Sequence, residues 1–127
     1  MSNLSMARSP SEPYRFVILA LLACEALIVA IFAFGSGQSE ITELTGLNSI
    51  ALHLLAFGTA AALASTIWPP LPVALGVLSS AVFVEGGQIF LPERDASAID
   101  VAIGAVGIAI GLALTWTLGL LLGRSLR

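Results

Sequence analysis

The chain has 127 residues, which suits a single domain, and 57% of them are hydrophobic while only 10% are charged. Soluble domains have an apolar content near ~45–50%, so the excess here, with a mean hydropathy of +1.00, is expected to face lipid. The net charge of −3 argues against a nucleic-acid partner, which would require a basic face. The single cysteine, Cys24, excludes an intrachain disulfide and any multi-cysteine metal site.

Four apolar segments follow a polar N-terminal tail at residues 1–15, which we expect to be disordered. A helix needs about 20 mostly apolar residues to cross a ~30 Å hydrocarbon core, and open sheet edges cannot exist in lipid. We therefore expect an all-α membrane protein, with a four-transmembrane-helix bundle over residues 16–123 and a short tail at 124–127. The predicted spans are residues 16–34, 49–68, 71–91 and 99–123.

Three connectors separate these spans. The first runs from Gly35 to Asn48 and is interpreted as a polar loop. The second contains Pro69 and Pro70, which must end one helix before the next begins. The third, residues 92–97, is the only strongly charged loop.

Arginine placement predicts the orientation. Arg8 and Arg15 precede the first span, and Arg124 and Arg127 follow the last one. By the positive-inside rule both termini are cytoplasmic, which four spans allow. The acidic first loop and the charged third loop then face the outside.

Ionisable groups within spans cost about 2.5–3.5 kcal/mol each on insertion scales, so each requires a reason. At 1.5 Å per residue, His53 and Glu85 lie roughly 6 and 9 Å below the outer ends of their spans. Asp100 starts the last span, and Arg94 lies in the loop just above it. All four fall in the outer third of the bilayer, and we expect His53, Glu85 and Arg94 to converge in space. Glu25 lies mid-span and has no obvious partner in the sequence.

The functional interpretation gives these residues distinct roles. His53 and Glu85 are the candidate catalytic residues, because either could transfer a proton. Gln88 lies three positions after Glu85, on the same helix face, where it would orient a ligand. Arg94 offers a planar fork for an anionic group, and Asp100 would fix Arg94 or His53.

Structural interpretations compete with these roles. Ser97 and Asp100 fit a capping box, in which Asp100 bonds back to the N–H of Ser97. Arg94 would then pair with a neighbouring acid in water, and His53 would be a buried histidine bonded to a carbonyl. One histidine with scattered carboxylates argues against a dedicated metal site, so we expect no metal and no cofactor.

The last span carries two G-x-x-x-G patterns and one further glycine a turn earlier. Small residues at this spacing let helix backbones approach closely, so the face is predicted to pack inside the bundle or against a partner. The predicted packing glycines are Gly104, Gly107, Gly111, Gly119 and Gly123.

Residues 85–100 follow the pattern E-x-x-Q-x-F-x-P-x-R-x-x-S-x-x-D, which resembles the signature of the VanZ-like family of small membrane proteins. His53, followed by Phe57, is similar to the histidine in the second span of that family. The resemblance covers about residues 48–111 and implies a multi-pass protein of the bacterial cytoplasmic (inner) membrane. Ile50 and Gly104 stand where the family often carries Lys and Asn, so two polar partners of the site are missing here.

Two functional hypotheses follow, and the sequence leaves open whether the chain is an enzyme. In the first, an outward-facing polar pocket binds or acts on a cell-envelope or lipid-linked ligand, with membrane lipids as partners. In the second, the chain is a non-catalytic accessory or structural subunit of a larger membrane complex. Its glycine faces and Glu25 would then contact other integral membrane subunits.

Overall fold

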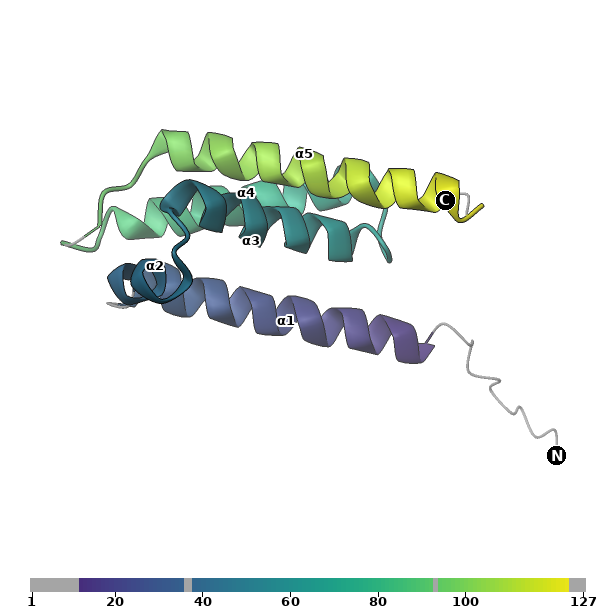
Figure 1. Ribbon diagram of the computed structural model, residues 1–127, viewed down its shortest axis with the longest axis horizontal. Coiled ribbons are helices and arrows are strands. Elements are labelled where there is room, and N and C mark those ends of the chain that lie inside the picture. Colours follow the sequence, from purple (N-terminus) through teal and green to yellow (C-terminus); the bar gives the residue numbers. More distant parts are fainter. Residues whose placement is uncertain (1–11, 36–37, 93, 124–127) are drawn as a thin grey trace, which may run out of the picture.

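The computed structural model describes residues 12–35, 38–92 and 94–123, and within these ranges the chain forms five α-helices and no strand. The all-α class is thereby confirmed. The helices, shown in Figure 1, are α1 (Glu12–Phe34), α2 (Gln38–Thr45), α3 (Ser49–Ala64), α4 (Pro70–Gln88) and α5 (Ala98–Leu121).

Three helices are long and apolar enough to cross a membrane: α1 from Pro13 onward, α4 and α5. They make the chain a multi-pass membrane protein. α3 is apolar too, but its 16 residues extend only about 24 Å at 1.5 Å per residue. This length falls short of the ~30 Å core, so α3 is not among the candidate spans.

The helix ends differ from the predicted spans for local reasons. α1 begins at Glu12, so residues 12–15 of the predicted disordered tail are helical, because a proline such as Pro13 is well tolerated in the first turn of a helix. α3 ends at Ala64 rather than at residue 68, because a tight turn has to precede Pro69. Residues 1–11 and 124–127, with three of the four terminal arginines, lie outside the described residues.

The connector predicted as a polar loop contains a helix, α2, so that interpretation was wrong. Its eight residues, QSEITELT, lack the long apolar run by which the other helices were recognised. Gly46 follows α2 with φ +68°, and its N–H bonds to Thr42 O at 2.9 Å. A left-handed glycine is a common helix terminator, so Gly46 was the available signal.

The α3–α5 pair forms the most extensive helix interface of the fold. Two glycines of the predicted packing face make it possible. A Cβ at Gly107 would lie 2.7 Å from Leu54 O, and one at Gly111 would overlap Gly58 O. The Thr115 hydroxyl, one turn beyond Gly111, lies 3.2 Å from Ala62 O of α3.

The other predicted packing glycines differ in their surroundings. A Cβ at Gly104 would lie 2.9 Å from the ring of Phe57, and Gly119 is buried. Gly123 lies beyond the end of α5 with φ +63°, and a Cβ there would meet nothing within 4 Å. Gly123 therefore ends the helix and does not pack inside the bundle, which leaves the predicted alternative of packing against a partner.

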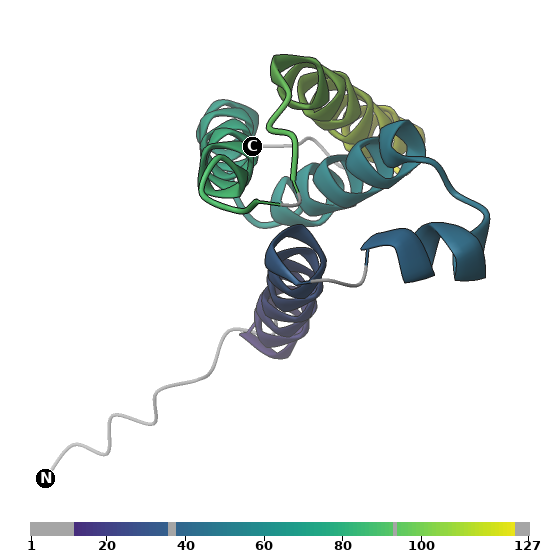
Figure 2. The same cartoon turned by 90° about the vertical axis from the view of Figure 1, so that its left-hand side faces the viewer.

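α3, α4 and α5 form the compact part of the bundle, and α1 lies against α3 and α4 on one side (Figure 2). The small core of this compact part is formed by Phe57, Ala61, Ala64, Val73, Ala81 and Ile108. The first turn of α1 and the last turn of α5 lie at the same end of the bundle, and the α4–α5 loop lies at the opposite end (Figure 1).

Candidate functional site

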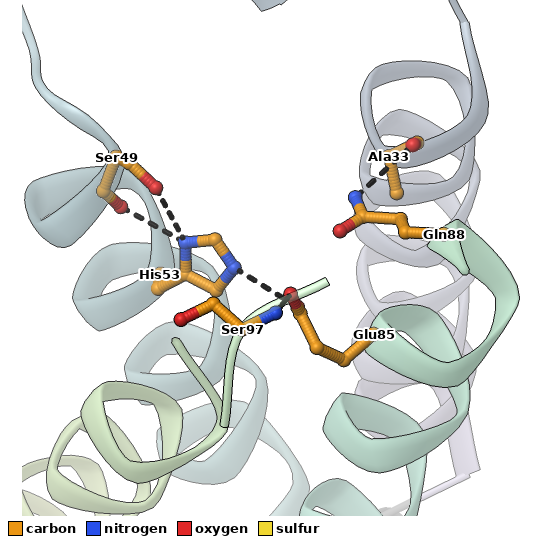
Figure 3. Close-up of polar contacts among 6 residues, drawn as sticks. All are labelled: Ala33, Ser49, His53, Glu85, Gln88 and Ser97. Atoms are coloured by element: carbon orange, nitrogen blue, oxygen red, sulfur yellow. Dashed lines mark hydrogen bonds and ion pairs between the residues drawn. The ribbon is translucent and has the colours of Figure 1, made fainter. Parts of the chain in front are cut away.

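Three ionisable side chains from three helices meet at the end of the bundle that carries the α4–α5 loop. They are His53 of α3, Glu85 of α4 and Asp100 of α5, and one ligand atom from each lies within 4.8 Å of the others. His53 Nε2 and Glu85 Oε2 are 3.8 Å apart (Figure 3). Glu85 is buried, at 6% exposure, and the other two are half-buried. The structure thus brings together the two candidate catalytic residues and one of the predicted ligand-binding residues.

The first turns of α3 fix the orientation of His53. The side chain of Asn48 caps the helix by accepting a bond from Ala51 N–H at 2.9 Å, so the backbone of Ser49 is helical. His53 Nδ1 lies 2.9 Å from Ser49 O and 3.4 Å from Ser49 Oγ (Figure 3). A carbonyl can only accept, so Nδ1 carries a proton, and in the neutral ring Nε2 would present its lone pair to Glu85.

Glu85 is fixed by the backbone of the next helix. Its Oε1 accepts a hydrogen bond from Ser97 N–H at 2.6 Å, across the gap between α4 and the start of α5. The predicted capping box is therefore wrong in its bonding. Ser97 is the N-cap residue of α5, but its side chain makes no capping bond, and its N–H is held by Glu85 instead of Asp100. Asp100 stays available to the cluster.

Gln88 and Arg94 contact the end of α1, away from this cluster. Gln88 Nε2 donates to Ala33 O at 3.1 Å, and one guanidinium nitrogen of Arg94 lies 2.8 Å from Phe32 O and 2.6 Å from Gly35 O. The last carbonyls of a helix lack hydrogen-bond donors within the helix, and here the side chains of Gln88 and Arg94 are the donors. Among the described residues no ion pair involves Arg94, so it does not pair with Asp95; Glu93, the other neighbouring acid of the structural interpretation, lies outside the described residues.

A cavity of about 540 Å³ lies between α1, α3 and α4. Its wall is mostly aliphatic and aromatic, and it includes four polar side chains: Glu25, His53, Thr59 and Gln88. His53 therefore belongs both to the carboxylate cluster and to the cavity wall. Two of the three helices that line it, α1 and α4, are long and apolar enough to cross a membrane.

Glu25 has a partner that the sequence did not reveal. Its Oε1 is hydrogen-bonded to Thr59 Oγ1 of α3, while its Oε2 is buried without a hydrogen-bond partner. A lone threonine in an apolar helix carries no distinctive signal, because such hydroxyls commonly bond to their own helix. Thr59 Oγ1 also lies 2.6 Å from Leu55 O. Only the mid-span position of Glu25 indicated that a partner was needed.

The polar residues thus form two separate groups. Gln88 and Arg94 tie α4 and its loop to α1, whereas His53, Glu85 and Asp100 bring an imidazole and two carboxyl groups together. The second group can share protons or hold a cation, and the cavity beside it can hold an apolar chain. No family model, curated protein or solved structure matches this chain.

Proposed function

We propose that this chain is a VanZ-like protein of the bacterial cytoplasmic membrane that binds an amphiphilic, lipid-linked ligand in the cavity between α1, α3 and α4. The observation that carries the proposal is a mostly apolar cavity wall that also contains four polar side chains, those of Glu25, His53, Thr59 and Gln88. A ligand hydroxyl or ammonium group would bond to one of these side chains, and its apolar chain would fill the rest of the cavity.

The size and chemistry of the cavity support this proposal. Ligand sites commonly enclose about 300–1,000 Å³, with apolar walls and a few convergent polar groups. A volume of about 540 Å³ and four polar side chains fit that description. The position of the cavity beside α1 and α4, two helices of membrane-crossing length, favours a ligand that arrives from the bilayer rather than from water.

The proposed topology has four crossings with both termini cytoplasmic. The common position of the α1 start and the α5 end at one end of the bundle supports an even number of crossings (Figure 1). α3 would cross with local thinning of the bilayer, the usual adjustment to a short helix. The arginines near both termini then lie inside, and His53, Glu85 and Asp100 lie near the outer, cell-envelope surface.

Native mass spectrometry of the protein released from a mild detergent tests the proposal. We expect the wild type to retain one lipid-sized ligand, and Ala56→Phe, which places an aromatic ring in the cavity, to lose it. Ala109→Phe is the matched control, because Ala109 is exposed on α5 and does not line the cavity. A folded wild type without bound lipid, or equal retention by both variants, would contradict lipid binding in the cavity.

A second function, that of an accessory subunit, is favoured by Gln88 and Arg94. These two residues were predicted to bind a ligand, yet they hold the end of α1. A polar group built as a helix clamp requires no ligand, and α1 exposes large apolar side chains such as Phe16, Leu27 and Ile31 that a partner helix could cover. Recovery of one stoichiometric membrane protein with this chain in mild detergent, with the cavity empty, would favour this alternative.

A further inference from the structure

We propose that His53, Glu85 and Asp100 form a binding site for a divalent transition-metal ion, for which Zn²⁺ is the best-matched probe. The sequence argued against such a site because it has one histidine and scattered carboxylates. The fold removes that objection by bringing the three residues together from α3, α4 and α5. The site shares His53 with the cavity wall, whereas Glu85 and Asp100 do not line the cavity.

The ligand atoms are the first argument. Imidazole nitrogen and carboxylate oxygen are both common ligands of zinc, at about 2.0–2.2 Å. Two ligands of a tetrahedral zinc ion are therefore ~3.4 Å apart. His53 Nε2 and Glu85 Oε2, at 3.8 Å, are already near this separation. The widest separation in the group, 4.8 Å at most, closes to this value with a movement of up to about 1.4 Å by Asp100, whose side chain is half-buried in the first turn of α5.

The second argument is the way His53 and Glu85 are held. A metal-binding histidine commonly donates its other ring N–H to a carbonyl, which fixes the tautomer and aims the free nitrogen at the ion. His53 has this arrangement, with Nδ1 at 2.9 Å from Ser49 O and Nε2 towards the carboxylates. Glu85 Oε1 is held by Ser97 N–H at 2.6 Å, so Oε2 is directed at the histidine (Figure 3).

The third argument is charge. Two carboxylates within a few ångströms of each other, one of them buried, repel unless a cation or a proton lies between them. Among the described residues no arginine pairs with either carboxylate, and Arg94 is bonded to the end of α1. A protonated His53 would pair with Glu85 at 3.8 Å, but its single positive charge would neutralise only one of the two carboxylates. A divalent ion would balance both negative charges and bind the neutral imidazole at once.

Zinc binding by the purified, tag-free protein in mild detergent tests the site. Metal is first removed from the protein with a chelator. The Cys24→Ser background removes the only thiol, so that a cysteine cannot bind the zinc ion. Titration against a chromogenic zinc chelator should show one ion per chain. Each of His53→Gln, Glu85→Gln and Asp100→Asn should weaken binding at least about 100-fold, because losing even an outer-shell partner costs about 10–100-fold.

Asp95→Asn is the matched control, because Asp95 is an exposed carboxylate five positions before Asp100. It should bind zinc as the wild type does. A folded wild type without saturable zinc binding would overturn the site, and so would wild-type affinity for zinc in all three ligand variants. Ala56→Phe separates this proposal from the proposed function: it should lose lipid while keeping zinc.

X-ray absorption on the zinc-loaded wild type provides a test that does not depend on how the variants fold. We expect one imidazole nitrogen and otherwise oxygen ligands around the ion, with a position left for water because three protein ligands leave a tetrahedral site open. A shell without imidazole, or one containing sulfur, would overturn the assignment.

Discussion

Replacing Gly111 by alanine tests the α3–α5 interface at its closest point. The added Cβ would overlap Gly58 O and lie 3.1 Å from Ala62 N, both of which are backbone atoms that move only if the helices separate. Overpacking typically costs about 1–3 kcal/mol, and alanine regains about 1 kcal/mol of helix propensity over glycine. Because the obstructing atoms are backbone, the cost belongs near the upper end of that range. We expect a net loss of about 2 kcal/mol in the free energy of unfolding.

Gly76 is the matched control. It lies inside α4, and a Cβ there would meet nothing within 4 Å. Gly76→Ala should therefore raise the free energy of unfolding by up to about 1 kcal/mol through propensity alone. Reversible unfolding in mixed micelles with increasing SDS, followed by circular dichroism, measures both variants. If Gly111→Ala were as stable as the wild type, the close glycine contact between α3 and α5 would be refuted.

Three further predictions use the polar contacts and the topology. Arg94→Gln should lower the free energy of unfolding by about 1–3 kcal/mol in the same SDS assay, because the charged donor to the α1 carbonyls is lost; an unchanged value would show that the loop does not hold α1. With metal removed by a chelator, Glu85→Gln should lower the free energy of unfolding by less than about 1 kcal/mol and Glu85→Ala by about 1–3 kcal/mol, since only glutamine still accepts a hydrogen bond from Ser97 N–H; equal losses would contradict that bond. Single cysteines at positions 3 and 126, introduced with Cys24→Ser, should escape an impermeant thiol reagent in intact cells, and labelling from outside would contradict the topology.

Length and apolarity predicted the helical class and the locations of the long helices, because both properties are local. α2 escaped prediction because its eight residues are polar and only Gly46 marked its end. The packing glycines of α5 were predicted from their repeated spacing, but the helix surface that they pack against was not predicted. Gly58 and Ala62 in α3 form a small-x-x-x-small pair, the same signal on the opposite helix.

The polar residues were easier to identify than to pair. Shared depth predicted that residues from different helices would meet, since a charge in lipid needs a partner. Depth says nothing of direction around a helix, so it could not show that Gln88 and Arg94 point to α1 while Glu85 points to His53. The capping box failed for the same reason. The local motif predicted Asp100 as the acceptor of Ser97 N–H, whereas in the folded chain Glu85 of α4 accepts that hydrogen bond.

The cavity ligand is the central claim, and site-specific photocrosslinking in cells tests it most directly. A benzophenone side chain at Val29 would face the cavity, whereas one at the neighbouring Ala30, which is exposed and does not line the cavity, would face bulk lipid. After irradiation and proteolysis, the adducts on the α1 peptide are identified by mass spectrometry. We predict one enriched lipid class at position 29 and the average membrane composition at position 30; the same lipid mixture at both positions would contradict a selective ligand in the cavity.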